Sequence, residues 1–428
     1  MRKIVILVCV LSISASAQTI TDTLTFMHYN VLNYRNITTY CTVSNNSPAQ
    51  KEGYMRTILS HVLPDIITCN EMAGDGGTAA KRLLDNALNQ QGRSYYKKAN
   101  YSANSNLSNM LYYNRNKLVL HKQDKIDRGA NNVQLVRQID AYTLFYLDQS
   151  ELDLGDTTFL TVYVAHLKAS SGSANVTERA LMTAAVMEYH GANYNGDHSY
   201  ILSGDFNIYT SSEEGYQNLI NGSNTAVNFY DPIDKSGSWN NSGTYASVHT
   251  QSTRASSGCH SGGGLDDRFD FVLCGKEVLD NERGLGYVPG SYTALGNDGN
   301  HFNGNINAGT NNAAPAAVID ALYNMSDHLP IIIKLTTART IASSRKATMD
   351  NFIVVSNPVA NQLYWKMQVP QKGVLRVTDI QGKDMLNYTT EASNEWIVND
   401  VSMWSQGTYY LSFISANGDV VRRKVVKL

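Results

Sequence analysis

The sequence predicts an α/β protein in which two mixed β-sheets pack together under covering helices, followed by a small β-sandwich. Up to about residue 336, strand-like and helix-like segments alternate without the strict strand–helix–strand repeat of a parallel sheet. Beyond residue 350, short strand-like segments at 352–355, 363–367, 374–378, 408–413 and 420–428 are separated by turn residues. A chain of 428 residues is long enough for these two domains.

Residues 1–17 predict a secretory signal peptide. Arg2 and Lys3 precede an apolar run over 4–13, and small residues follow at 15–17. The run is shorter than the roughly 20 residues that span a bilayer, so we expect no transmembrane segment. The formal net charge of -2 indicates no general attraction to nucleic acid. Any phosphate binding must therefore be local or depend on a metal.

Export would permit disulfide bonds. Four cysteines follow the predicted signal peptide: Cys41, Cys69, Cys259 and Cys274. Four cysteines allow three pairings, and the sequence does not select one. Cys69 and Cys274 lie in apolar, strand-like runs, which favours buried free thiols at these two positions.

The first 336 residues contain alternating strand and helix signals. β-branched and aromatic residues predict strands at 26–30, 64–71, 110–113, 117–120, 138–147, 159–166, 200–205, 267–273 and 329–335. Apolar residues at helical spacing predict helices at 54–62, 79–90 and 176–190. Between residues 207 and 326 the chain is rich in Ser, Gly and Asn, which is typical of loops that shape access to a site.

Several strands end in polar side chains that can carry chemistry. The stretch Tyr200–Asn207 ends in Asp205 and Asn207, which we expect on one face of a strand, and Gly204 permits a close backbone approach. Other segments end in an amide, a carboxylate, an imidazole or an adjacent acid and imidazole: Asn30, Glu71, His166, and Asp327 with His328. A fold that gathers strand ends at one edge would bring these side chains together.

The order and content of these motifs, over about residues 20–336, resemble the endonuclease/exonuclease/phosphatase superfamily. Its members include deoxyribonuclease I, abasic-site endonucleases, neutral sphingomyelinases and inositol polyphosphate phosphatases. The resemblance implies a four-layer αββα sandwich like that of deoxyribonuclease I. It also implies a metal-dependent hydrolase of phosphate esters.

The chemistry of phosphodiester hydrolysis suggests a role for each residue. Hard oxygen ligands favour Mg²⁺, with Mn²⁺ or Ca²⁺ as alternatives, and we expect Glu71, Asn30 and Asp327 to hold the ion. Asp205 would orient or deprotonate the attacking water, and Asn207 would hold that water or the phosphate.

The resemblance supplies the remaining roles. It implies that Asp270 orients His328, that His166 is the general acid, and that Arg137 contacts phosphate. One departure concerns His166, because deoxyribonuclease I orients its acid histidine with a Glu, whereas residues 98–120 of this chain contain no Asp or Glu. Either His166 therefore has another partner, or its role as an acid is weaker than in that enzyme.

The residues after 336 predict a linker and a separate module. Residues 337–350 are rich in Ser, Thr, Ala, Lys and Arg, without apolar periodicity. The motifs Ser356–Val359, Asp379–Lys383 and Gln406–Tyr410, with a Lys-Val-Val-Lys ending, resemble the sorting domain of the type IX secretion system. The expected domains are thus a signal peptide at 1–17, a catalytic domain at 18–336, a linker at 337–350 and a sorting domain at 351–428.

These observations predict a secreted or cell-surface, metal-dependent phosphodiesterase, most simply an endonuclease that acts on extracellular DNA or RNA. We expect a monomer whose partners are nucleic acid and the type IX secretion machinery. Two alternatives remain open at this stage. One is a sphingomyelinase-like lipid phosphodiesterase, and the other is a non-catalytic surface-binding protein on the same scaffold.

Overall fold

The structure is a computed structural model, and it falls into two units. It describes residues 18–20, 22–147, 157–337, 339–341, 352–354, 357–367, 370–393, 395–415 and 420–428. The predicted signal peptide and residues 342–350 of the predicted linker lie outside these ranges. The larger unit comprises 22–147 and 157–337, and the C-terminal strands belong to the smaller unit.

Two mixed sheets form the centre of the larger unit. One has the strand order β10-β11-β9-β8-β7-β6: Phe229–Tyr230, Asp270–Gly275, His198–Asp205, Phe159–His166, Gln134–Tyr146 and Leu118–Arg128. The other has the order β12-β14-β2-β3-β5-β4, with β13 paired to β14: Gly286–Tyr287, Ile331–Thr336, Thr23–Tyr34, Ile66–Ala73, Leu107–Asn114, Tyr96–Lys98 and Thr293–Ala294. Only the central pairs β2–β3 and β8–β9 are parallel among the strand pairs described here.

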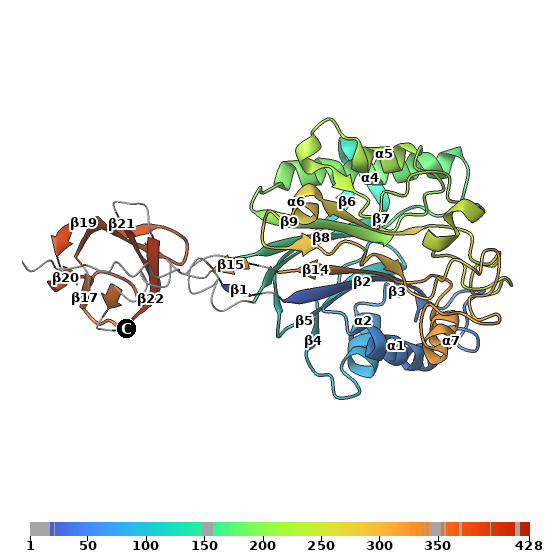
Figure 1. Ribbon diagram of the computed structural model, residues 1–428, viewed down its shortest axis with the longest axis horizontal. Coiled ribbons are helices and arrows are strands. Elements are labelled where there is room, and N and C mark those ends of the chain that lie inside the picture. The colour runs from blue at the N-terminus through green and yellow to red at the C-terminus, as the bar shows by residue number, and fades with distance from the viewer. Residues whose placement is uncertain are drawn as a thin grey trace, which may run out of the picture. The chain divides into compact units, whose positions relative to one another are not determined.

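Helices cover the outer faces of both sheets (Figure 1). On one side lie α1, α2 and α7: Pro48–Val62, Thr78–Leu83 and Ala316–Met325. On the other side lie α4 and α5, with the short α6 nearby: Ser173–Asn193, Glu214–Ile220 and Lys276–Leu279. The arrangement is helix, sheet, sheet, helix, which confirms the predicted mixed α/β sandwich.

The alternation of side chains along a strand explains how the six-stranded sheet packs on both faces. On β9, Ile201 belongs to the core between the sheets, and Leu202 belongs to the core under α4 and α5. Asp205 is an even number of residues from Ile201, so it projects between the sheets. A Cβ on Gly204 would lie 1.9 Å from Ala165 O on the neighbouring strand, so this position requires glycine.

The smaller unit is all-β, as expected. It contains a three-stranded antiparallel sheet, β16-β17-β20: Phe352–Val354, Gln362–Met367 and Ile397–Asp400. A four-stranded antiparallel sheet has the order β19-β18-β21-β22: Asp384–Ser393, Gln371–Asp379, Gly407–Ser415 and Val420–Lys427. Trp365, Leu375 and Phe413 are buried in a core of this unit's own. Strands β19 and β20 were not predicted, since they are polar and only partly buried.

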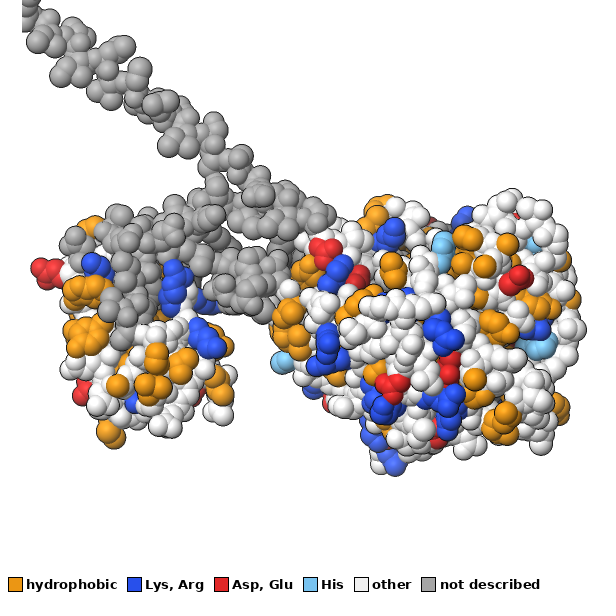
Figure 2. Space-filling view, turned by 90° about the horizontal axis from the view of Figure 1, so that it is seen from below, with side chains coloured by type: hydrophobic (Ala, Val, Ile, Leu, Met, Phe, Trp, Pro, Cys, Tyr) orange, Lys and Arg blue, Asp and Glu red, His pale blue; other side chains and the backbone are white. Residues whose placement is uncertain are grey.

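The predicted linker contains one strand within the described residues. β15 (Arg339–Ile341) pairs antiparallel with β1 (Gln18–Ile20), and the two are grouped with the C-terminal unit. The boundaries predicted at residues 336 and 351 remain predictions. Figure 2 shows basic and acidic side chains interspersed on the visible face of the larger unit, which fits the small net charge.

Asp267 and Arg268 are neighbours in sequence, which suggests a surface ion pair between them, but the structure does not form this pair. Arg268 is fully buried, and its two Nη atoms donate to Asp231 at 2.8 and 2.9 Å. Its guanidinium also lies 4.4 Å from the centre of the Phe271 ring. Asp267 instead accepts a hydrogen bond from Asn240 at 2.7 Å. The partner of Arg268, Asp231, lies 37 residues away in sequence, and no local sequence pattern indicates this pairing.

This buried ion pair generates a prediction about stability. Asp231→Ala should lower the free energy of unfolding by about 3–5 kcal/mol, because it leaves the Arg268 charge buried without a partner. Urea unfolding followed by tryptophan fluorescence measures this change. Asp280→Ala breaks the exposed Lys276–Asp280 pair and is the matched control, which should leave the midpoint unchanged. Equal midpoints for the two variants would contradict the prediction.

Candidate active site

Strand register aligns three of the predicted residues in the six-stranded sheet. His166 on β8 lies opposite Asp205 on β9, and Asp205 lies opposite Asp270 on β11. Residues opposite one another on neighbouring strands project from the same face of a sheet. The amide Nδ2 of Asn30, on the other sheet, donates to Asp205 Oδ2 at 3.0 Å. The row of three residues therefore faces the interior between the two sheets.

Glu71 reaches the same place from an irregular end of β3. The β2–β3 register shifts after Asn30, and Glu71 has a left-handed backbone with φ of 60°. Its Oε1 accepts from Asn30 Nδ2 at 3.1 Å, and its Oε2 accepts from the backbone N–H of Asn33 at 3.0 Å. The carboxylate is thus held from two directions.

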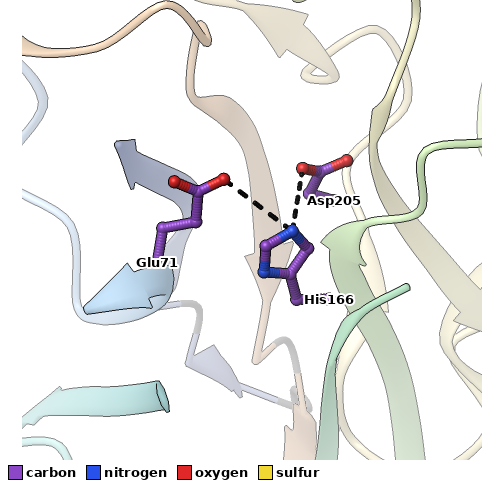
Figure 3. A group of neighbouring side chains, drawn as sticks. All are labelled: Glu71, His166 and Asp205. Carbon is purple, nitrogen blue, oxygen red and sulfur yellow. Dashed lines mark ion pairs between the residues drawn. The ribbon is translucent and has the colours of Figure 1, made fainter. Parts of the chain in front are cut away.

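Glu71, His166 and Asp205 form a compact cluster of potential metal ligands, here called the cluster (Figure 3). His166 Nε2 lies 3.5 Å from Asp205 Oδ2 and 3.8 Å from Glu71 Oε1. One ligand atom from each of the three residues lies within 4.8 Å of the others. Two carboxylates and an imidazole suit a divalent cation, and the carboxylates favour a hard ion such as Mg²⁺ or Mn²⁺.

Burial sets the charge of this group. It lowers the pKa of His166 well below the usual value, and the nearby Arg137 charge lowers it further, so the imidazole is neutral. Burial also raises the pKa of Asp205 to about 7, although the neighbouring His328 charge opposes the shift. A neutral imidazole can act as a metal ligand, and this carboxyl can exchange a proton near neutral pH.

Asp270 and His328 form a buried ion pair beside this group. His328 Nδ1 lies 2.7 Å from Asp270 Oδ2, and His328 Nε2 lies 3.7 Å from Asp205 Oδ2. Burial would lower the pKa of His328, but Asp270 and Asp205 raise it well above its usual value. Burial would likewise raise the pKa of Asp270, but the His328 charge holds it low. His328 is therefore an imidazolium and Asp270 a carboxylate.

His28 is a site residue that the sequence analysis missed. Its Nε2 lies 3.5 Å from Asp270 Oδ1, so Asp270 stands between two histidines. Its Nδ1 lies 3.0 Å from Thr68 Oγ1. His28 precedes Asn30 by two residues on β2 and so shares its face, which was the available signal.

Asn30 presents its nitrogen to the carboxylates. The backbone N–H of Leu32 donates to Asn30 Oδ1 at 3.0 Å, which fixes the orientation of the amide. Its Nδ2 faces Glu71 and Asp205. This orientation favours a role in holding the carboxylates over the predicted role as a metal ligand.

Two other predicted residues, Asp327 and Arg137, lie around this group with different contacts. Asp327 Oδ2 accepts from the Ser261 N–H at 2.8 Å, and Asp327 Oδ1 lies 4.0 Å from His328 Nε2. Arg137 Nη1 donates to Leu167 O at 2.6 Å. Burial lowers the pKa of Arg137, while the charges of Glu71 and Asp205 oppose the shift, which places the guanidinium near the cluster.

The expectation that Asp205 and Asn207 leave one face of a strand is wrong. β9 ends at Asp205, and Asn207 has a left-handed backbone with φ of 51°. The chain turns here so that the backbone N–H of Asn207 donates to Asp205 Oδ1 at 3.1 Å. The Asn207 side chain donates to Leu167 O at 3.4 Å, the same oxygen that accepts from Arg137.

A chain of buried amides supports Asp205 from behind. Asn70 Oδ1 accepts from the Asp205 N–H at 2.8 Å, and Asn70 Nδ2 donates to Asn109 Oδ1 at 2.8 Å. Asn109 Nδ2 in turn donates to Asp140 Oδ2 at 3.0 Å. Asn109 lies on β5, within residues 98–120, which contain no Asp or Glu. The polar group that this strand contributes is therefore an amide and not a carboxylate. No sequence pattern marks these residues, because Asn is also common in turns.

The structure confirms the prediction that Cys69 and Cys274 are buried free thiols. Cys41 and Cys259 form a disulfide. The disulfide joins the loop after β2 to the loop that carries Ser261, the donor to Asp327. Asn33 Nδ2 lies 3.7 Å from Cys41 Sγ. The bond therefore ties together two loops that contact the cluster.

Lys51, near the start of α1, is buried, with 2% of its surface exposed. Its Nζ donates to Leu32 O at 2.6 Å and to Asn46 Oδ1 at 2.8 Å. Burial lowers the pKa of this amine to about 7, against the charges of Asp327 and Glu71. This residue was also missed, since lysines are rarely buried.

The C-terminal residues match a known family. Residues 356–427 match the model of the family described as secretion system C-terminal sorting domain. The match confirms the predicted sorting domain and indicates export by type IX secretion to the cell surface or the extracellular space. Within the part of the chain that the structure describes, no helix is long and apolar enough to cross a membrane.

Similar solved structures are distant in sequence. The human Nocturnin catalytic domain with bound sulfate is 15% identical, over 74% of this chain and 97% of that chain, with a TM-score of 0.46. An endonuclease/exonuclease/phosphatase family protein of Bacteroides thetaiotaomicron is 12% identical, over 74% and 98%, with a TM-score of 0.46. A mannosyl-6-phosphatase of the same organism is 12% identical, over 73% and 99%, with a TM-score of 0.45. No curated protein matches the sequence.

The buried amine of Lys51 generates a prediction about pH. Its pKa in the folded protein, about 7, lies below the ordinary value of 10.5, so the unfolded chain binds more protons between these two pH values. The contribution of Lys51 to stability should therefore rise with pH across this window. Urea unfolding at pH 7, 8.5 and 10 should show the wild type gaining stability relative to Lys51→Met. A constant difference between the two proteins would contradict this.

Proposed function

We propose that this protein is a secreted, metal-dependent phosphodiester hydrolase, and that nucleic acid is its substrate. The observation that carries the proposal is that a set of potential metal ligands and a buried imidazolium lie side by side at one edge of the sandwich. One group is Glu71, His166 and Asp205, which can hold a divalent cation. The other is the imidazolium of His328, fixed by Asp270 at 2.7 Å. A phosphate bound between them would be neutralised from both sides.

The proposed division of labour follows from the contacts. Glu71 would hold the cation, and Asn30 would keep Glu71 and Asp205 in place through its amide nitrogen. When bound, the cation would supply positive charge to the phosphate oxygens. Asp205 would take the proton of the attacking water, a role that a carboxyl with a pKa of about 7 fits near neutral pH.

The remaining side chains would surround the phosphate and the departing oxygen. His328 would donate through Nε2 to a phosphate oxygen, since Asp270 occupies its Nδ1, and the side-chain amide of Gln251, 2.6 Å from this Nε2, would share or yield that position. His166 would face the leaving oxygen, or it would serve as a second ligand beside Glu71, because its neutral Nε2 lies close to both carboxylates. Arg137 and Asn207 would contact the phosphate, and Asp327 would lie at the rim as a second acidic group.

A lipid phosphodiester is the second candidate substrate, and one surface feature favours it. The loop after β2 exposes three large apolar side chains, Ile37, Tyr40 and Val43, with 55%, 75% and 63% of their surfaces accessible. The disulfide at Cys41 fixes this loop close to Asn33 and therefore to Glu71. Apolar side chains held outward beside such a site could contact a lipid surface.

The hydrolase proposal generates a prediction about metal and Asp205. Purified protein should cleave plasmid DNA or RNA with Mg²⁺ or Mn²⁺ and lose that activity in EDTA. Asp205→Asn should lower kcat by about 10²–10⁴-fold, because the variant cannot accept the proton of water. Asp280→Asn, on the exposed end of α6, is the control and should retain full activity.

The same assay separates the alternatives. Cleavage of sphingomyelin vesicles without cleavage of nucleic acid would show that the substrate is a lipid and not a nucleic acid. Cleavage that persists in EDTA would refute the metal mechanism. Binding of nucleic acid without cleavage under any of the tested ions would identify a surface-binding protein on a hydrolase scaffold.

We also propose that the catalytic domain works without the sorting domain. The residues of the proposed site lie between positions 28 and 328. The C-terminal strands bury a hydrophobic core of their own. Deletion of residues 351–428 should leave a folded, active hydrolase that accumulates in the periplasm. Activity of the purified truncated protein, and its distribution between periplasm and medium, test this. A truncated protein that unfolds or is inactive would show that the boundary is wrong.

A further inference from the structure

The backbone beside the cluster is held in an unfavourable conformation. Leu32, Asn33 and Arg35 have φ values of 42°, 46° and 64°, and Glu71 has a φ of 60°. The left-handed region costs an ordinary L-residue roughly 1–2 kcal/mol, and the cost is highest for bulky residues such as Leu32. Such a turn persists only where its surroundings enforce it.

Two buried side chains enforce the Leu32–Asn33 turn. Lys51 Nζ donates to Leu32 O at 2.6 Å and to Asn46 Oδ1 at 2.8 Å. Asn46 Nδ2 donates to Asn33 O at 3.0 Å and to Leu32 O at 3.3 Å. Lys51 and Asn46 are 2% and 6% exposed. Both carbonyl groups of the turn are thus held by one connected pair of side chains.

The opposite side of the turn faces the cluster. The backbone N–H of Asn33 donates to Glu71 Oε2 at 3.0 Å, and the N–H of Leu32 donates to Asn30 Oδ1 at 3.0 Å. These two contacts set the orientation of the Glu71 carboxylate and of the Asn30 amide. Lys51 and Asn46 therefore act on the cluster through two peptide units without touching it.

We propose that Lys51 and Asn46 are positioning residues that hold the Leu32–Asn33 turn so that Glu71 is fixed for binding a divalent cation. This inference rests on the proposed function. Outer-shell groups that orient metal ligands typically change metal affinity by 10–100-fold when removed.

The choice of residue supports a role beyond packing. A lysine near the N-terminus of α1 is disfavoured by the helix dipole, and burial of its amine adds a desolvation cost. An apolar side chain would avoid both costs. The amine instead donates to a turn carbonyl and lies in the field of Glu71 and Asp327, which raise its pKa against the effect of burial.

The test is the affinity of the full-length protein for Mn²⁺, measured by isothermal titration calorimetry at one pH. Lys51→Met removes the donors but keeps an unbranched apolar side chain, and Asn46→Ala removes the second half of the pair. Lys117→Met is the matched control, because Lys117 Nζ donates to Thr23 O at 2.9 Å at the far end of the same strand. We expect the first two variants to bind Mn²⁺ 10–100-fold more weakly and the control to change by less than about twofold.

The outcomes are distinguishable. If Lys51→Met and Asn46→Ala lower Tm but bind Mn²⁺ like the wild type, the pair is structural only and the inference is overturned. If the wild type binds no Mn²⁺, the proposed function fails first and the inference fails with it. If Lys51→Met does not fold, Asn46→Ala decides, since it leaves the Lys51–Leu32 contact in place. A tenfold loss in the Lys117→Met control would also overturn the inference, because it would show that any change in β2 weakens binding.

Discussion

The contact between Asp270 and His328 joins the two sheets at the edge where the cluster lies. Asp270 begins β11 of one sheet, and His328 precedes β14 of the other, with Nδ1 and Oδ2 2.7 Å apart. Both side chains are almost fully buried, so neither charge is stable without the other. His28 adds a second imidazole on the far oxygen of Asp270. The same imidazolium moderates the raised pKa of Asp205, so the charge of the cluster depends on this pair.

Regular and irregular backbone contribute different parts of the site. Regular register places His166, Asp205 and Asp270 in a row, which requires little beyond strand pairing. Glu71 is positioned by irregular backbone, namely the shifted end of β3 and the left-handed turn after Asn30. A bulged strand end can aim one side chain independently of its neighbours, and such features are frequent near functional sites. The metal-binding end of the proposed site is thus the part that depends most on supporting residues.

The arrangement fits an exported hydrolase. Oxidising surroundings allow the Cys41–Cys259 bond, which fixes two loops beside the cluster, while Cys69 and Cys274 are buried and behave as small apolar residues. The match to a sorting domain accounts for residues 356–427, which form a core of their own. A division of labour between the proposed hydrolytic domain and an export module would explain why the chemistry-bearing motifs stop before residue 336 while the chain continues.

The sequence by itself determined the fold class, the all-β C-terminal module and the residue types at the strand ends, because apolar periodicity and motif order are local properties. It also marked Cys69 and Cys274 as buried thiols and Gly204 as a point of close approach. Only the tertiary structure decided which groups meet. Arg268 pairs with Asp231, Asn207 turns away from the line of β9, and Asn30 faces the carboxylates with its nitrogen. The supporting residues Asn70, Asn109, Lys51 and His28 were likewise visible only in three dimensions, since the energy of a buried polar group is set by partners far along the chain.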